Sequence, residues 1–284
     1  MAKTEEIAAL YTLIDDPDEE VFGVVSERIV NYGTPIIPTL EHWWETTPNE
    51  QVQNRIENLI HRLQFRDLRR NFTDWKHSPR PELLTGALLC ATFHFPELAT
   101  APVIADLEKL RRNIWLELNN YLTPLEQVNV FHNILYGYYA LRSMPRDESK
   151  PEHFLINKII TGKKGTQAGN GLLYLILCEQ LDLPIRAIQL PNQFILAYIK
   201  NGGVENNRRA EFFIDPTGGQ IYTHKDIETY FKRINEPLEP NYLEPLSNTG
   251  TIAKLIDELS SSFDASKEAQ KIIELQELSA FLKS

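Results

Sequence analysis

The residues best suited to chemistry lie between a glycine-rich segment and an aspartate that precedes a proline. The segment 162–171 reads GKKGTQAGNG and leads into an apolar run, 172–181, that we expect to form a buried helix. A group at the N-terminus of such a helix meets the positive end of the helix dipole and free N–H groups. That setting lowers the pKa of a thiol and can hold an oxyanion. Strands after the helix could bring a base and its orienting carboxylate alongside.

Three runs of strand-like composition follow the helix and would position this chemistry. They cover residues 185–190, 194–199 and 211–214. We interpret residues 200–209 (KNGGVENNRR) as the turn between the last two runs, and residues 223–232 as a helix that follows the short segment 220–222. The pattern therefore predicts a small antiparallel sheet next to the buried helix.

The order of several short motifs resembles the SirB-type branch of the transglutaminase-like superfamily over residues 81–233. The most specific motif is FIDPTGG at 213–219. The weaker motifs stand at 154–160, 164–165, 172–175, 181–184 and 191–196. The resemblance implies a papain-like α+β core built around a Cys-His-Asp triad.

The resemblance places this triad on three positions of the chain. In the superfamily the cysteine stands two residues after a glycine at the start of the helix, which makes Gly165 the glycine and Gln167 the cysteine position. The histidine position falls on Gln193, and the aspartate position on Asp215, which matches. The expected pocket around them consists of Gly165, Thr166, Asn170, Tyr174, Asn192 and Thr217.

The two departures from the triad remove the groups that make and break bonds. A glutamine amide is neither a nucleophile nor a base near neutral pH, and loss of both groups removes nearly all rate from such sites. Cys178 lies about three helical turns, roughly 16 Å, beyond Gln167 and is too far away to replace the thiol. The Thr166 hydroxyl is adjacent but lacks a base.

We therefore hold two hypotheses about function. The first is a non-catalytic binding or scaffold protein with a protein or peptide partner. The alternative is an acyl-transfer or amide-hydrolysing enzyme of the cysteine-protease or transglutaminase kind. Under either hypothesis, we expect the side chains of Gln167, Gln193 and Asp215 to converge within about 3–4 Å or through one water.

Simpler interpretations of these residues stay open. Gln167 and Gln193 could be ordinary residues that face solvent, and Asp215 could only open a turn, a role that aspartate favours. The glycines 165, 169 and 171 are interpreted as a loop that needs positive φ angles, because no P-loop spacing supports a phosphate cradle.

The first third of the chain contains an internal repeat. Pro17 and Pro48 stand 31 residues apart in similar surroundings, DDPDEEV and TTPNEQV. In each copy we predict a capping residue, Asp16 or Thr47, followed by proline at the first helical position. Paired helices at this period resemble two HEAT-type repeats.

These patterns predict a mostly helical α+β protein. N-terminal α-solenoid-like helices would pack on a transglutaminase-like (papain-like) core with a small antiparallel sheet. The predicted domains are HEAT-like repeats at 1–66, the helical part of the SirB-type region at 67–150, the core at 151–247, and a TPR-like C-terminal helix pair at 248–284.

Composition limits the partners and the compartment. With 39 acidic and 29 basic residues and a net charge of −10, the chain repels phosphate backbones, so we expect no nucleic-acid partner. Cys90 and Cys178 lie in apolar runs and are predicted to be buried thiols in a reducing compartment. An early acidic N-terminus and the lack of a 20-residue apolar run predict a cytoplasmic protein that does not enter a membrane.

Metal, cofactor and aromatic sites are not indicated by the remaining residues. The seven histidines lack a ligand spacing, so we expect neither a metal nor a cofactor. We predict that the four tryptophans, Trp43, Trp44, Trp75 and Trp115, pack in the core or between helices. The sequence does not indicate an oligomeric state.

Overall fold

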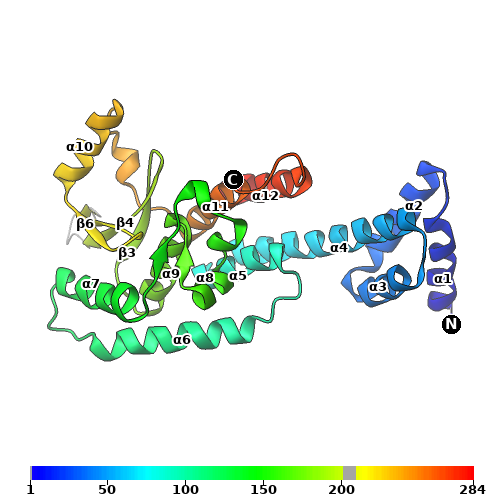
Figure 1. Ribbon diagram of the computed structural model, residues 1–284, viewed down its shortest axis with the longest axis horizontal. Coiled ribbons are helices and arrows are strands. Elements are labelled where there is room, and N and C mark those ends of the chain that lie inside the picture. The colour runs from blue at the N-terminus through cyan, green and yellow to red at the C-terminus, as the bar shows by residue number, and fades with distance from the viewer. Residues whose placement is uncertain (1, 201–208) are drawn as a thin grey trace. The chain divides into compact units, whose positions relative to one another are not determined.

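The computed structural model describes residues 2–200 and 209–284, which divide into two compact units. The units are residues 1–74 and 75–284, and their elements are labelled in Figure 1. Most described residues are helical and the strands form small sheets, so the predicted α+β class is confirmed. The predicted turn at 200–209 lies, apart from its two end residues, outside the described residues. The division into four domains stays a prediction.

The first unit is built from helices whose apolar faces share one core. Buried residues from all of them form a cluster that includes Ile14, Ile29, Leu40, Ile56 and Leu63. The helices are α1 (Ala2–Ile14), α2 (Glu19–Tyr32), α3 (Ile37–Thr46) and α4 (Glu50–Lys76), which ends just beyond this unit.

The sequence repeat is also a repeat of local structure. Oδ1 of Asp16 accepts the N–H of Asp18 (2.9 Å), and Oγ1 of Thr47 accepts the N–H of Asn49 (3.4 Å). Asp18 and Asn49 then accept the N–H two residues further on, at 2.8 and 3.0 Å. The prediction that Asp16 and Thr47 are the caps is therefore wrong by two residues. Each proline precedes its cap, because the residue before a proline is held in an extended conformation and the helix starts later.

The second unit joins the remaining helices to a four-stranded antiparallel sheet of order β3-β4-β5-β6. The strands are β3 (Ile185–Leu190), β4 (Gln193–Lys200), β5 (Arg209–Asp215) and β6 (Gln220–Tyr222). β6 was not expected; the segment is only three residues long and pairs with the end of β5. β1 (Arg142–Ser143) and β2 (Lys164–Gly165) form a separate parallel pair.

The part of the second unit that the structure describes contains eight further α-helices. They are α5 (Leu83–His94), α6 (Thr100–Glu117), α7 (Pro124–His132), α8 (Ile156–Gly162), α9 (Gln167–Gln180), α10 (His224–Ile234), α11 (Asn248–Ser260) and α12 (Ala269–Lys283). Thr123 and Glu126 form a capping box that starts α7, as a threonine before proline predicts. After its last residue, His132, α7 changes to a π-helical turn at Asn133–Tyr138.

Helices α9 and α10 cover opposite faces of the sheet (Figure 1). Side chains alternate along β4: Phe194 faces Gly171 of α9, whereas Ile195 belongs to the cluster that includes Ile227 and Phe231 of α10. Helix α9 is buried from Ala168 to Cys178. The polar residues at its first turn therefore sit at an edge of the core.

The glycines at the start of α9 serve close packing and not a positive-φ loop. Gly169 and Gly171 lie within the helix, and none of Gly165, Gly169 and Gly171 has a positive φ. A Cβ on Gly169 would lie 2.5 Å from the backbone oxygen of His153, and one on Gly171 would lie 2.5 Å from the ring of Phe194. The predicted loop over 162–171 is thus wrong for its second half.

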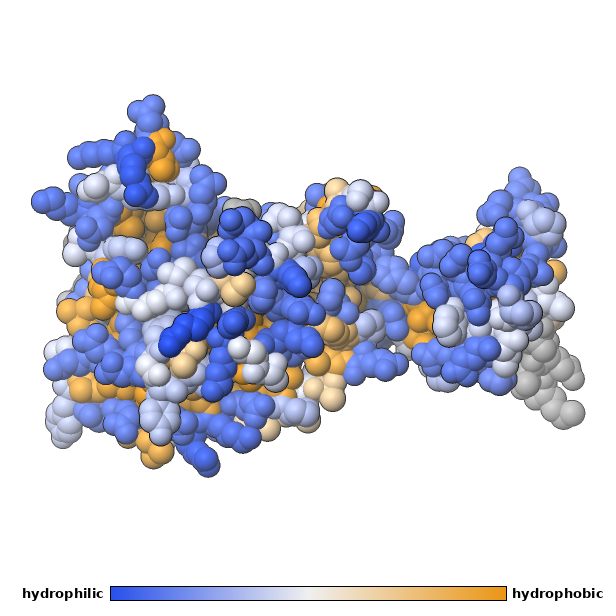
Figure 2. Space-filling view, viewed as in Figure 1, coloured by the Kyte–Doolittle hydropathy of each residue, from blue (hydrophilic) through white to orange (hydrophobic). Residues whose placement is uncertain are grey.

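Trp115 contradicts the prediction that the tryptophans pack in the interior. Its side chain lies on α6 and is 60% exposed, whereas Trp75 is buried and donates its indole N–H to the carbonyl of Glu82 at 2.9 Å. Leu116 and Tyr138 are exposed as well, and Figure 2 shows apolar surface over α6 and α7. The helical spacing of apolar residues in α6 did not reveal which of them face solvent.

Candidate functional site

The side chains of Gln167, Gln193 and Asp215 meet at the start of α9. Nε2 of Gln167 donates to Oε1 of Gln193 (2.9 Å) and to Oδ1 of Asp215 (3.3 Å). Oε1 of Gln167 accepts the backbone N–H of Phe194 at 3.1 Å. The Gln167 amide thus bonds α9 to both β4 and β5.

Local structure explains why these three positions converge. Thr166 caps α9 by accepting the N–H of Gly169 (3.2 Å), so Gln167 is the first helical residue. Gln193 is the first residue of β4, and Asp215 is the last residue of β5. Because β4 and β5 are antiparallel neighbours, the start of one and the end of the other lie side by side.

Asp215 both forms a turn and borders the site. Its Oδ1 accepts the N–H of Thr217 at 2.9 Å, which organises the turn after β5. The same oxygen accepts a hydrogen bond from Nε2 of Gln167. Asp215 therefore both forms the turn and supplies a carboxylate to the site, so the two interpretations of this residue are compatible.

A cavity of about 440 Å³ opens beside Gln193 and Asp215, between the sheet and α10. Its lining combines an apolar part with two carboxylates, one guanidinium, two tyrosines and an amide. The lining residues are Leu190, Gln193, Ile195, Asp215, Tyr222, Asp226, Ile227, Thr229, Tyr230 and Arg233. A volume of this size suits a small ligand or a short segment of chain.

The other residues expected in the pocket do not line this cavity, because they are buried beneath it or belong to the neighbouring turns. Asn170 is fully buried and donates to the carbonyl of Arg142 at 3.1 Å. Tyr174 is fully buried as well. Asn192 is exposed in the turn between β3 and β4, where it adopts a φ of 57°. Gly165 and Thr166 are buried ahead of α9, and Thr217 contributes its N–H to Asp215.

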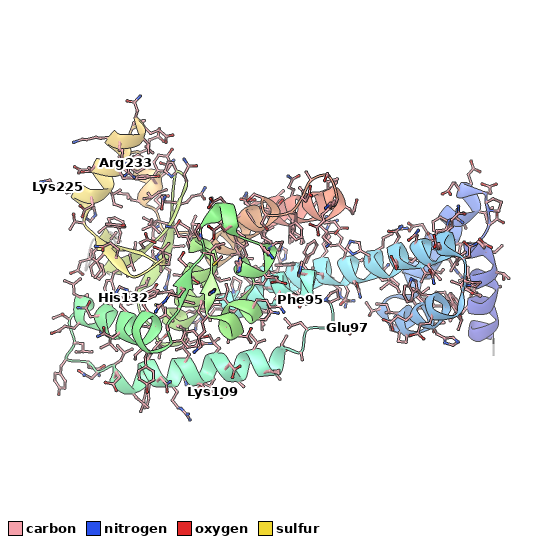
Figure 3. The ribbon with its side chains drawn as sticks, in the orientation of Figure 1. Phe95, Glu97, Lys109, His132, Lys225 and Arg233 are labelled. Carbon is pink, nitrogen blue, oxygen red and sulfur yellow. The ribbon has the colours of Figure 1, made fainter. Side chains whose placement is uncertain are left out.

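Sequence reasoning missed two residues behind the turn that follows Asp215. The Nε2 atom of His132 lies 3.2 Å from the Tyr174 hydroxyl. The Tyr136 hydroxyl donates to the carbonyl of Pro216 at 3.1 Å. His132 is the last residue of α7, and Figure 3 labels it there. His132 belongs to α7 and Tyr136 to the π-helical turn after it, both far from the motifs in sequence, so no spacing signal could have connected them to the site.

Gly219 allows His132 to approach this turn. A Cβ at Gly219 would lie 2.8 Å from Nδ1 of His132, and its φ of +81° favours glycine. Burial lowers the pKa of His132 from 6.5 to about 4, so the ring is neutral near pH 7. Burial, together with the charge of Asp215, raises the pKa of the Tyr136 hydroxyl well above its usual value. The region behind the turn is therefore uncharged and poorly solvated.

Neither cysteine can supply a thiolate. Burial raises the pKa of Cys90 to about 12 and raises that of Cys178 well above its usual value. Both side chains are buried, as predicted. Nucleophilic thiols need partial exposure, and both of these side chains are buried.

The described part of the chain contains neither a cluster of metal ligands nor a membrane-spanning helix. Within residues 2–200 and 209–284, no group of three or more His, Cys, Asp or Glu side chains could hold a metal ion. Among the same residues, no helix combines the length and apolar character needed to cross a bilayer.

Comparison with known proteins identifies the family. A family model described as the transglutaminase-like superfamily matches residues 101–257, which is more than half of the chain. The chain therefore belongs to the transglutaminase-like superfamily. The matched range includes α9, which carries Gln167, and the whole four-stranded sheet, which carries Gln193 and Asp215.

Two bacterial relatives have a weaker likeness to the chain. The UPF0162 protein PA3419 of Pseudomonas aeruginosa is 24% identical over 208 residues, covering 69% of this chain and 72% of that protein. A UPF0162 protein of Vibrio cholerae is 21% identical over 184 residues, covering 64% of this chain and 66% of that protein. No solved structure matches the chain.

Proposed function

We propose that this protein is a non-catalytic member of its superfamily that binds a protein or peptide partner in the cavity beside Gln193 and Asp215. One observation carries the proposal: the Gln167 amide is bonded to Gln193 and to Asp215, and these two glutamines stand where the resemblance leads us to expect the thiol and the imidazole. An amide supplies hydrogen bonds for recognition but neither a nucleophile nor a base. The site is therefore suited to binding and not to acyl transfer.

The bonding of the two amides differs in a way that supports recognition. Gln167 uses both ends of its amide internally, with Gln193, Asp215 and the N–H of Phe194. Gln193 uses its oxygen only; among the described residues no acceptor is recorded for its NH₂ group. Because Gln193 lines the cavity, that group can donate to the carbonyl of a bound peptide.

We also propose the finer affiliations. The motifs at 154–160 and 213–219 support the SirB-type branch. The 31-residue repeat supports HEAT-like helices, and α11 and α12 support a TPR-like closing pair; both would offer surfaces to a partner. Two buried, unpaired cysteines support a cytoplasmic location.

A peptide array tests the proposed function. The full chain is tested for binding to an array of 12-residue peptides. Each peptide that binds is then incubated in solution with the protein, and its mass is measured by mass spectrometry. We expect binding without cleavage or transfer. Thr229→Arg places a long side chain in the cavity from an exposed position and should abolish binding, whereas Glu228→Arg, next to it but outside the lining, should not. Cleaved peptides, or peptides bound equally by Thr229→Arg, would overturn the proposal.

A further inference from the structure

One face of α10 carries opposite charges at its two ends, directly over the cavity. Asp226, Ile227, Tyr230 and Arg233 follow the spacing of a single helical face, and all four line the cavity. Asp226 and Arg233 are seven residues apart, which corresponds to about 10 Å along the helix axis. A ligand that lies along α10 therefore passes from a carboxylate to a guanidinium.

Two carboxylates line the cavity, Asp215 at the end of β5 and Asp226 in the first turn of α10, and each has one oxygen outside its own turn or cap. Oδ1 of Asp215 is engaged by Thr217 and Gln167, and Oδ2 of Asp226 accepts the N–H and the hydroxyl of Thr223, each at 2.7 Å. In the described part of the chain, no partner is recorded for the second oxygen of either carboxylate. These two oxygens are available to a cation.

Tyr222 connects the charged groups in space. Burial raises the pKa of its hydroxyl, the charges of Asp215 and Asp226 raise it further, and the charge of Arg233 lowers it. All three charged side chains are thus near enough to one ring to act on it. The opposite charges belong to one cavity and not to separate surfaces.

The basic end is held against the turn between β3 and β4. The Tyr230 hydroxyl donates to the carbonyl of Pro191 at 2.5 Å, which fixes the second half of α10. The Arg233 guanidinium lies 5.5 Å from the centre of the Tyr230 ring and is exposed. Within the described residues no carboxylate pairs with Arg233. Figure 3 labels Arg233 on α10, away from His132 on α7.

The middle of the cavity suits a peptide unit with an apolar side chain. Leu190, Ile195 and Ile227 supply the apolar lining between the two charged ends. The NH₂ group of Gln193 offers a donor beside them. An extended peptide covers about 3.3–3.6 Å per residue, so about 10 Å corresponds to three residues.

We infer that the cavity binds a short peptide of about three residues with both ends free, its ammonium group held by Asp215 and Asp226 and its carboxylate by Arg233. This inference rests on the proposed function and narrows it from peptides in general to peptide termini. The Gln193 amide would donate to the central carbonyl, and an apolar middle residue would contact the lining from the sheet.

Calorimetric titration of the full chain tests the inference with Ala-Leu-Ala as the probe. The free tripeptide is compared with its N-acetyl form, its C-terminal amide and the doubly capped form. Because each capped end loses a charge-assisted contact, we expect each single cap to weaken binding by about tenfold or more. Free leucine and a free-ended hexapeptide should also bind more weakly, since neither can place both charged ends on their partners.

Variants assign each end of the peptide. Arg233→Gln should bind the free tripeptide and its C-terminal amide with equal affinity. Asp226→Asn should bind the free tripeptide and its N-acetyl form with more nearly equal affinity than the unaltered chain does. Lys232→Gln, an equal charge change on α10 outside the cavity lining, should behave as the unaltered chain. Asp226 also takes part in a capping box, so its variant is first compared by unfolding midpoint; if it does not fold, Arg233→Gln decides the outcome.

The outcomes separate this inference from the proposed function. Equal affinity for free and capped tripeptides overturns the inference and leaves peptide binding in place. The inference is also overturned if the Arg233→Gln variant still prefers the free carboxylate to the C-terminal amide. Failure of every peptide, free, capped or arrayed, to bind overturns both, and hydrolysis of the tripeptide overturns the proposed function.

Discussion

Replacing Gln167 with methionine tests whether the three side chains form a stabilising network. Methionine has a similar shape and volume, so the substitution leaves the packing almost unchanged. It removes the three hydrogen bonds of the amide, to Gln193, to Asp215 and to the N–H of Phe194. The loss leaves partners that were satisfied in the folded protein without a donor or acceptor.

The structure sets the size of the effect. A hydrogen bond contributes about 0.5–1.5 kcal/mol net, and a side chain that is only half-buried lets water replace part of the loss. We therefore expect Gln167→Met to lower the free energy of unfolding by about 2 kcal/mol. For a unit of this size the melting temperature should fall by about 4–8 °C.

Urea denaturation followed by circular dichroism measures this difference, with a matched control in the same sheet. Gln189 on β3 is exposed and has no recorded side-chain hydrogen bond among the described residues, so Gln189→Met should change stability by less than about 0.5 kcal/mol. A double-mutant cycle with Gln193→Met should give a coupling energy of about 1 kcal/mol. If Gln167→Met were as stable as Gln189→Met, the network described here would be refuted.

Three further predictions concern His132, the cysteines and the two glutamines. Because the pKa of His132 is lower in the folded chain (about 4) than in the unfolded chain (6.5), its contribution to stability is complete above pH 7 and falls as the pH decreases; about 2 kcal/mol should be lost by pH 5. His132→Gln should lack this slope in urea titrations, and an equal slope would contradict the assignment. Cys90 and Cys178 should resist iodoacetamide at pH 8 until urea unfolds the chain, and native labelling seen by mass spectrometry would show that burial is wrong. Gln167→Cys should react with iodoacetamide faster in combination with Gln193→His than alone, since the imidazole would lower the thiol pKa; slower or equal labelling would show that the two positions do not meet as described.

Much of the second unit follows from local signals in the sequence. The predicted limits of β3 agree with the structure because four of the six residues in the run 185–190 are apolar and the run is bounded by Pro184 and Pro191. The start of α7 was predictable because Thr123 and Glu126 act within one turn. The meeting of Gln167, Gln193 and Asp215 needed the family resemblance, since the three residues are distant in sequence and none is chemically unusual.

Other features depend on contacts that no local pattern reports. The roles of Gly169 and Gly171 are set by a carbonyl and a ring from other elements, so their spacing suggested a loop instead of a tightly packed helix. Trp115 shows the converse, since an apolar residue in a helical pattern can face solvent. Similarly, β6 exists because Gln220–Tyr222 pairs with β5, and three residues are too few for a sequence signal. His132 reaches the turn only through the tertiary fold.

Mass spectrometry of Ala-Leu-Ala and of array peptides, incubated with the full chain and with Asp215→Asn, tests the central claim most directly. If two amides have replaced the thiol and the imidazole, every peptide keeps its mass in both incubations, including those that bind. A hydrolysed or transferred peptide that forms with the unaltered chain and disappears with Asp215→Asn would contradict the claim, because the site would then convert what it binds.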